Sequence, residues 1–410
     1  MSPTTSYKAL FAISGRRYIV IAFLARLPLA MSQLGVLLLV AERTGSYAIG
    51  GGCAGALALA NAIGAPLFGN AADRIGQRPI ALTQSISGAA GLIAIVALSQ
   101  SAVAWPLIAA MCAATGLMLP QVGPLARVRW RPIIAHRDQP VRLVDTAFSY
   151  EGAADEASFV LGPAFVGIFG AFGGPQFALE IAAVVLAVFG VWFAVHPTAA
   201  LIQRTSLAQG APARLLTPAI GILCVAQLLI GSVFGSVQTG TTVIATNAGY
   251  ASITGLFHAL LGVGSVLAGV GMASVPATFA YADRLRLAAL ALFALSTPLL
   301  LVDSLATLIP VLLILGCCVA PYMITTFTMA EVITPMPRVG AAMTLLAAAT
   351  GLGYACGTTI SGYFADEHGA TGAFAVTVTA CVLGAALAVG TRRPLLRASS
   401  QVKDAASVPA

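Results

Sequence analysis

The chain has 410 residues, of which 59% are hydrophobic and only 9% are charged, and its formal net charge is +7. A soluble domain carries about a quarter charged residues, so this composition excludes an ordinary soluble globular protein. Apolar runs of bilayer-spanning length recur along the whole sequence, and the short alternating segments of a transmembrane β-barrel do not. The sequence therefore predicts an all-α polytopic membrane protein.

Twelve segments in chain order are long and apolar enough to cross a hydrocarbon core of about 30 Å. They lie near residues 18–40, 47–69, 79–98, 105–126, 146–171, 176–195, 217–240, 252–275, 286–302, 305–330, 340–364 and 371–390. A loop with Pro, Gly, Ser and two arginines divides them six and six. We therefore predict two pseudo-symmetric six-helix bundles over 1–195 and 216–391, a cytoplasmic linker over 196–215, and a disordered cytoplasmic tail over 392–410.

Basic residues give the orientation. With the N-terminus inside, only Arg43 falls outside, and only Arg26 falls within a span. This asymmetry predicts an integral plasma (inner) membrane protein with both termini in the cytoplasm. The positive charge is thus a topology signal, and no nucleic-acid partner is expected. The seven cysteines lack metal-ligand spacing, so we predict neither a metal nor a cofactor, and we expect a monomer in the lipid bilayer.

The main ionisable candidates inside predicted spans are Arg26 in span one, and Glu151, Asp155 and Glu156 in span five. An ionised side chain at mid-bilayer costs at least about 2.5–3.5 kcal/mol, so these groups need partners or water. At 1.5 Å per residue Arg26 lies about 12 Å into its span, level with Asp155 at about 14 Å and Glu156 at about 15 Å. Glu151 and Asp155 share a helix face, whereas Glu156 is turned by about 100°.

We predict that either Asp155 or Glu156 pairs with Arg26 and stays charged, because one arginine does not easily serve three acids. The remaining carboxylates, or that pair once opened, would carry protons or meet a cationic substrate. A purely structural charge network in span five is the alternative interpretation. The second half has Thr350 and Gly351 opposite the acids Asp155 and Glu156, so one half alone carries this chemistry.

The loop after span two, "GNAADRIGQR", resembles the loop 2–3 signature of the major facilitator superfamily. The matching residues are Gly69, Asp73, Arg74, Gly76 and Arg78, and Gln77 replaces one expected basic residue. The resemblance implies a rocker-switch transporter in which this loop braces the cytoplasmic side in the outward-open state. A carboxylate near a helix N-terminus is stabilised by the helix dipole, which suits such a latch. A basic loop that only sets topology is the alternative.

Span five also is similar to the antiporter motif of drug–proton exporters, through Ser158, Gly162, Pro163 and Gly167. Ser158 and Val166 stand where that motif has glycine, and the span-four arginine of proton-coupled exporters is missing. The superfamily fold would place spans 1, 4, 7 and 10 around a central cavity. Candidate cavity residues are Gln33, Gln121, Gln238, His258 and Tyr322. Each alone is more often a hydrogen bond between helices than a substrate contact.

No Walker A, His-Glu-x-x-His or nucleophile-elbow motif is present, so we predict neither an enzyme nor an ATP-driven pump. The two halves echo each other, for example in Ala-Asp-Arg at 72–74 and 282–284. The function predicted is a secondary active transporter that exports small organic molecules in exchange for protons. The alternatives are a solute or sugar facilitator or importer, and a transporter-like receptor or scaffold that moves nothing.

Overall fold

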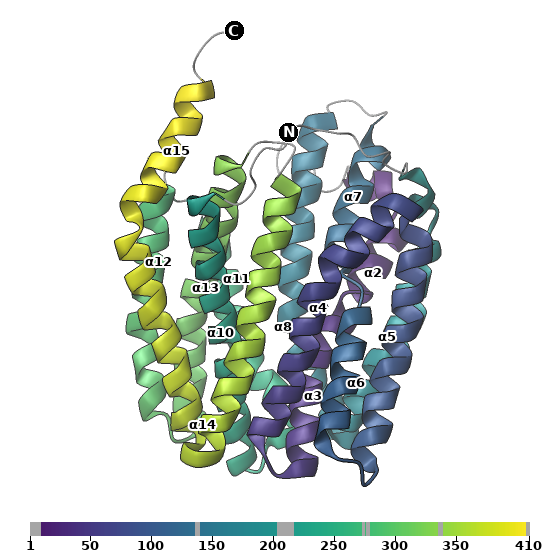
Figure 1. Ribbon diagram of the computed structural model, residues 1–410, viewed down its shortest axis with the longest axis vertical. Helices are drawn as coiled ribbons and strands as arrows, with labels where there is room; N and C mark the ends of the chain where they lie inside the picture. The colour runs from purple at the N-terminus through teal and green to yellow at the C-terminus, as the bar shows by residue number, and fades with distance from the viewer. Residues whose placement is uncertain are drawn as a thin grey trace.

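The structure is a computed structural model that describes residues 10–135, 140–202, 217–272, 275, 279–334 and 339–406. The elements assigned in these ranges are all helical (Figure 1). The α-helices are α2 (Arg16–Leu24), α3 (Leu27–Thr44), α4 (Tyr47–Ile75), α5 (Gln77–Gln100), α6 (Trp105–Met118), α7 (Val122–Ile134), α8 (Pro140–Val185), α9 (Val191–Val195), α10 (Pro218–Asn247), α11 (Thr254–Gly271), α12 (Tyr281–Ser296), α13 (Leu305–Ile333), α14 (Val339–Gly390) and α15 (Arg392–Ala406). Shorter helical turns are η1 (Leu186–Gly190), η2 (Pro197–Leu201), η3 (Ala251–Ile253) and η5 (Thr297–Leu301).

Nine helices within the described ranges are long and apolar enough to cross a membrane. Two of them are too long for one crossing, because α8 has 46 residues and α14 has 52, whereas about 20 residues span a bilayer. Each leaves helical geometry inside, α8 at Gly173 and Gly174 and α14 at Gly369. Gly174 (φ 73°) and Gly369 (φ 63°) adopt left-handed conformations that favour glycine, and the chain turns back there. The shorter α11 is also apolar, and a total of twelve crossings stays a prediction.

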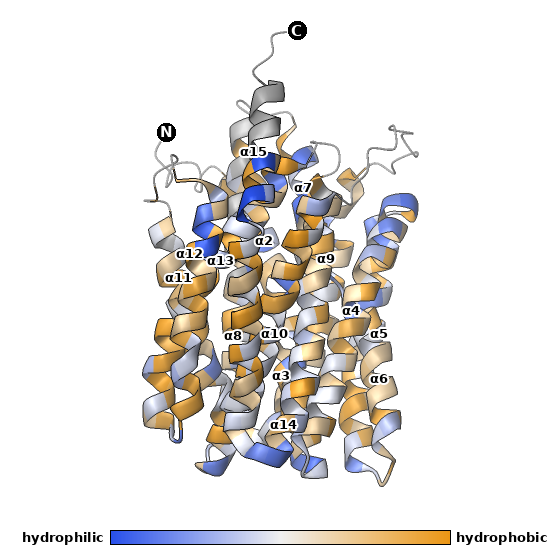
Figure 2. Cartoon of the chain, turned by 60° about the vertical axis from the view of Figure 1, so that its left-hand side comes forward, coloured by the Kyte–Doolittle hydropathy of each residue, from blue (hydrophilic) through white to orange (hydrophobic). Residues whose placement is uncertain are grey.

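The helices stand side by side, and their long axes run vertically in Figure 1. We call the end with α7 and α15 the upper end, and the end where α14 turns back the lower end (Figure 1). Apolar residues dominate the middle of the helices, and hydrophilic residues gather toward their ends (Figure 2). This distribution is the one that a bilayer requires.

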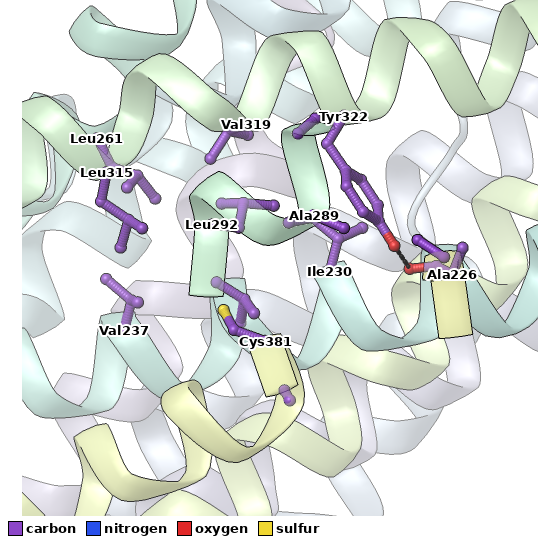
Figure 3. Packing of buried hydrophobic residues seen from close by; sticks show 14 of the residues in the cluster. Ala226, Ile230, Val237, Leu261, Ala289, Leu292, Leu315, Val319, Tyr322 and Cys381 are labelled. Atoms are coloured by element: carbon purple, nitrogen blue, oxygen red, sulfur yellow. Dashed lines mark hydrogen bonds between the residues drawn. The ribbon is translucent and has the colours of Figure 1, made fainter. Parts of the chain in front are cut away.

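Buried apolar residues form separate clusters in the two parts of the chain. One cluster runs from Ile220 to Leu395, and another runs from Leu27 to Leu186. In the first cluster Tyr322 packs near Ile230 and Cys381, and its hydroxyl donates to the carbonyl of Ala226 at 3.0 Å (Figure 3). The division of the apolar core agrees with the expected two-part organisation, but the two-bundle arrangement itself stays a prediction.

Glycines bring the two parts together along two helix pairs, α4 with α14 and α8 with α11. A Cβ atom on Gly55 of α4 would lie 2.6 Å from the Thr359 hydroxyl of α14. A Cβ atom on Gly167 of α8 would lie 2.9 Å from the amide nitrogen of Leu256 on α11. Only glycine permits such close backbone approach, as is usual for packed membrane helices.

The tail expected to be disordered is instead helix α15 over Arg392–Ala406, and residues 407–410 lie outside the described ranges. Its amphipathic pattern buries Leu395, which is 1% exposed. The Arg392 guanidinium donates twice to Asp283 of α12, at 2.6 and 3.1 Å, and this carboxylate raises the pKa of Arg392. Composition had indicated disorder because it carries no information about this anchor on a distant helix.

Candidate functional site

A break in the first crossing places Arg26 at the centre of the site. Pro28 cannot donate a backbone hydrogen bond, so the helix stops at Leu24 and resumes at Leu27. The Arg26 amide bonds Phe23 at 3.1 Å, three residues back, which leaves the Ala22 carbonyl without its usual partner. The Arg26 Nη1 atom donates to that carbonyl at 2.8 Å, so the side chain repairs the break that holds it in place.

Arg26 holds two carboxylates of α8. Its Nε atom lies 2.9 Å from Asp155 Oδ1, and its Nη2 atom contacts Glu151 Oε2. The two acids stand four residues apart on one helix face, so both reach the same guanidinium. The side chains of Arg26 and Glu151 are 3% and 0% exposed, whereas that of Asp155 is 26% exposed.

Helix α7, which follows α6 along the chain, completes the network. Arg127 Nη2 lies 2.6 Å from Asp155 Oδ2, and the Trp130 indole donates to Glu151 Oε1 at 2.6 Å. Every carboxylate oxygen of the two acids therefore has a donor. The Arg127 side chain is 36% exposed, so the network runs from a closed end at Glu151 to an open end at Arg127 and Asp155.

The position of α7 follows from a second helix break. Pro120 disfavours helical geometry at the preceding residue, and Leu119 is extended with ψ 123°. The Asn61 amide of α4 donates to the Leu119 carbonyl at 2.9 Å, which the break leaves without a backbone partner, and to the Gly116 carbonyl at 3.0 Å, which the Leu119 amide also binds at 3.3 Å. Gln121 in turn donates to Asn61 Oδ1 at 2.6 Å. The break redirects the chain so that α7 faces α8.

Small groups around Asp155 fix its position. A Cβ atom on Gly123 would lie 2.7 Å from Asp155 Oδ2, so only glycine leaves room for this carboxylate. The Ser158 hydroxyl donates to the Asp155 backbone carbonyl at 2.7 Å. The carboxylate is therefore held between two arginines on one side and the α7 backbone on the other.

Two arginines and two carboxylates give this network no net charge when both acids are ionised. Glu151 is enclosed and fully bonded, so it serves as a fixed counter-charge for Arg26. Asp155 is the acid that water reaches. If Asp155 gains a proton, the network becomes positive and Arg127 loses its charged partner.

The network contains Arg26, Glu151 and Asp155, which are three of the four main candidates within the predicted spans. Arg26 pairs with Asp155, and Glu151 joins the same guanidinium rather than staying apart. The Glu156 side chain lies outside the described part of the structure. Arg127 and Trp130 were not singled out from the sequence, because the arginines of this segment looked like topology signals. Their spacing of three residues, which places them on one helix face, was the available signal.

The residues of the loop signature are spread around the upper ends of α4 and α5. Asp73, Arg74 and Arg78 are exposed, Gly69 is half-buried, and Gly76 takes a positive φ of 105° between the helices. Gln77, the departure from the signature, is 2% exposed. It accepts a hydrogen bond from Arg129 Nε at 3.0 Å and donates to the Leu125 carbonyl at 3.2 Å.

Three of the four antiporter-like residues of α8, Gly162, Pro163 and Gly167, serve packing. A Cβ atom on Gly162 would lie 2.5 Å from the Ala30 side chain of α3. Pro163 and Gly167 face α11, where the Pro163 carbonyl meets Gly255. This stretch therefore joins α3 on one side to α11 on the other, next to Ser158 and the charge network.

The candidate cavity residues lie in different surroundings. Three of them form hydrogen bonds to other helices: Gln238 donates to the Tyr354 hydroxyl at 2.7 Å, Gln121 donates to Asn61, and Tyr322 donates to the Ala226 carbonyl. Gln33 is half-buried on α3, and the Nδ1 atom of buried His258 has no partner among the described residues. A pocket of about 320 Å³ lies between α11, α12 and α13, and none of the five candidates lines it. Its lining is Gly269, Met272, Tyr281, Arg284, Ile324, Thr325 and Thr328.

Comparison with known proteins shows which fold this chain shares. A family model described as Major Facilitator Superfamily matches residues 280–409, which is less than half of the chain. No curated protein sequence matches. Among solved structures, the nucleoside transporter NupG is similar with a TM-score of 0.69 at 15% identity, over 93% of this chain and 99% of that one. The chain has a transporter fold.

Other transporters share this fold. The human organic anion transporter MFSD10 (TETRAN) is similar with a TM-score of 0.59 at 18% identity, over 91% of this chain and 99% of that one. A POT family transporter in complex with 5-aminolevulinic acid has a TM-score of 0.65 at 13% identity, over 94% and 96% of the two chains. At such identities the likeness concerns the fold, and no site residue transfers with it.

Proposed function

We propose that this chain is a secondary active transporter of the major facilitator type, which exports small organic molecules by alternating access in exchange for protons. Three lines support the proposal: the transporter fold over more than nine-tenths of the chain, the family match at residues 280–409, and the resemblance of the loop signature. The observation that supports proton coupling is that Arg26 and Arg127 share the Asp155 carboxylate.

Asp155 is the residue that we propose takes the proton. It is 26% exposed, whereas Glu151 is fully enclosed by Arg26 and Trp130. A proton on Asp155 weakens the contact with Arg127 while Glu151 keeps Arg26 in place. Because Arg127 lies on α7 and Asp155 on α8, this contact ties the two helices together beside the bond from Trp130 to Glu151, and its loss weakens the hold of α8 on α7. Proton binding is thereby linked to helix position.

We infer that the upper end faces the cytoplasm, with both termini inside and the chain in the inner or plasma membrane. The basic residues Arg16 and Arg17 of α2, and Arg392 and Arg393 of α15, lie on helices at that end (Figure 1). Arg43 ends α3 at the other. The positive-inside rule favours this orientation. We further propose twelve crossings in two bundles and a monomer.

The proposal is tested by flux in proteoliposomes under an imposed pH gradient, with a panel of cationic, neutral and anionic organic molecules. The wild type is expected to move at least one of them at a rate that follows the gradient. Asp155→Asn, which cannot take a proton, is expected to lose at least about tenfold of the gradient-driven rate and its pH dependence.

Asp303→Asn is the matched control, since Asp303 is an exposed acid in the loop between η5 and α13. It is expected to transport like the wild type. Equal, pH-dependent transport by Asp155→Asn would refute Asp155 as the proton carrier. Flux that ignores the gradient would identify a facilitator, and gradient-driven uptake with the protons would identify an importer. No flux across the whole panel would favour a scaffold.

A further inference from the structure

At the lower end, the carboxylate of Asp366 on α14 caps the first turn of α4. It accepts hydrogen bonds from the backbone amides of Tyr47 at 2.6 Å and Ala48 at 3.1 Å, and from the Ser46 hydroxyl. Ser46 itself caps the amide of Ile49 at 3.2 Å. The amide groups that begin a helix have no partner within it, so Asp366 satisfies donors that would otherwise face water.

This contact joins the two parts of the chain. Asp366 and Ser46 are 320 residues apart, and they belong to the helices that pack across the middle of the molecule. The carboxylate also lies at the positive end of the 29-residue helix α4, so charge and hydrogen bonds act together. Among the described residues, the hydrogen bonds to Asp366 are the only ones that join the start of α4 to α14 at this end.

The seam between α4 and α14 is tightest beside this contact and loosens upward. Gly51 packs against the Thr358 carbonyl, and a Cβ atom on Gly55 would lie 2.6 Å from the Thr359 hydroxyl. Further up, a Cβ atom on Gly351 would meet Ala62 at 3.2 Å, and one on Gly69 would meet nothing within 4 Å. The two helices therefore close at the lower end and part toward the upper end.

The upper end of the same helix carries a second acid in the opposite situation. Asp73 lies in the last turn of α4 and is exposed, with no hydrogen bond or ion pair among the described residues. The structure thus shows the lower contact made while the acid at the upper end is unengaged. Asp73 lies at the upper end of α4, and Asp366 lies at the lower end, just before the turn inside α14; this arrangement suits a pair of contacts that alternate.

We propose that Asp366 is a latch that holds the lower end closed by capping α4, and that it must release before the lower end can open. The inference rests on the proposed alternating access. In an outward-open conformation α4 and α14 separate below, so the first turn of α4 exchanges the carboxylate for water. The latch therefore sets the balance between the two conformations and takes no part in binding substrate or protons.

The test uses distances between spin labels in the full chain, in lipid nanodiscs without substrate, so it does not depend on transport. The native cysteines are replaced, and labels are attached at Arg43→Cys and Asp303→Cys across the lower end. A second preparation carries Arg131→Cys and Arg393→Cys across the upper end. These four positions are exposed and lie on different parts of the chain.

Asp366→Asn is expected to increase the population with a long lower distance and a short upper distance by roughly two- to fivefold, the range for a charge at a helix terminus. Ser46→Ala, which removes one partner and keeps the charge, is expected to shift it less. Asp73→Asn is expected to shift the balance the opposite way. Glu367→Gln is the control, since this exposed neighbour makes no bond to α4, and its distances should match the wild type.

Distances in Asp366→Asn that equal those of Glu367→Gln would overturn the latch, as would a lower end that closes further. If Asp366→Asn does not fold, Ser46→Ala decides in the same way, because it leaves the acid in place. If the wild type shows no flux but Asp366→Asn shifts the distances between the labels, the proposed function is refuted and the latch stands. If the wild type transports along the pH gradient but Asp366→Asn leaves the label distances unchanged, the latch is refuted and the proposed function stands.

Discussion

Gln77 explains at the residue scale why this chain departs from the loop signature that it resembles. The signature has a basic residue at this position, but here the side chain is buried against Arg129, which is 0% exposed. Arg129 donates to Gln77, to the Phe193 carbonyl at 2.9 Å and to the Thr198 hydroxyl at 3.1 Å, and stacks on the Phe193 ring. It has no acid partner among the described residues, so a second cation would have nothing to neutralise it.

Restoring the signature is therefore expected to harm the protein. Gln77→Arg would place two guanidinium groups together in a buried site and should lower the free energy of unfolding by about 3 kcal/mol or more. Denaturant titration in mild detergent measures this. The control Arg78→Gln removes an exposed charge from the same turn, and should change stability by less than about 0.5 kcal/mol. A Gln77→Arg protein as stable as the wild type would contradict the burial argument.

At the scale of elements, two prolines produce the helix breaks that build the charge network. Pro28 separates α2 from α3, and Pro120 separates α6 from α7. Each break leaves a carbonyl without a backbone partner, and a polar side chain donates to it: Arg26 to Ala22 at the first and Asn61 to Leu119 at the second. Irregular backbone at membrane depth is tolerated where protein groups replace the lost bonds.

Asn61 is expected to be essential to the second break. Asn61→Leu leaves the Leu119 carbonyl without a donor and the Gly116 carbonyl with the Leu119 amide alone, and should lower the free energy of unfolding by about 1–3 kcal/mol if the Leu119 carbonyl stays buried. Asn70→Leu on the exposed part of the same helix is the control and should have little effect. The same titration in detergent compares them. Similar stability of the two variants would show that water satisfies those carbonyls.

On the scale of the whole molecule, the close contacts across the middle lie toward one end. The α4–α14 and α8–α11 pairs both approach through glycines near the lower end. Asp366 adds a charged cap at that end, while Asp73 and Arg74 at the upper end are exposed. This asymmetry is what a conformation closed below and open above requires.

Adding one methyl group to the seam is expected to shift this balance. Gly51→Ala places a Cβ atom against the Thr358 carbonyl, so the lower end should open. A cysteine introduced between α4 and α14 at the lower end should then react faster with a membrane-impermeant thiol reagent. Gly52→Ala is the control, because a Cβ atom there meets nothing within 4 Å. Equal reaction rates in the two variants would show that the seam does not hold the lower end closed.

Sequence by itself determined what depends on composition and on periodicity along one chain. The bilayer demands long apolar helices, so the membrane class and most helices could be predicted. The shared depth of Arg26 and Asp155 and the shared face of Glu151 and Asp155 followed from helix geometry. The Ala-Asp-Arg echo was less informative, because Asp73 ends α4 whereas Asp283 begins α12 and binds Arg392.

Only the tertiary structure decided which groups meet. Arg127 and Trp130 looked like residues of a basic loop, and the break at Pro120 turned them toward α8. Glu151 joined Arg26 because Trp130 satisfies its second oxygen, and α15 formed because Asp283 anchors its first residue. Asp366 met the start of α4 because the glycine seam brings distant helices together. Such contacts join side chains from segments that are remote in the sequence, and no local pattern encodes which remote segments meet.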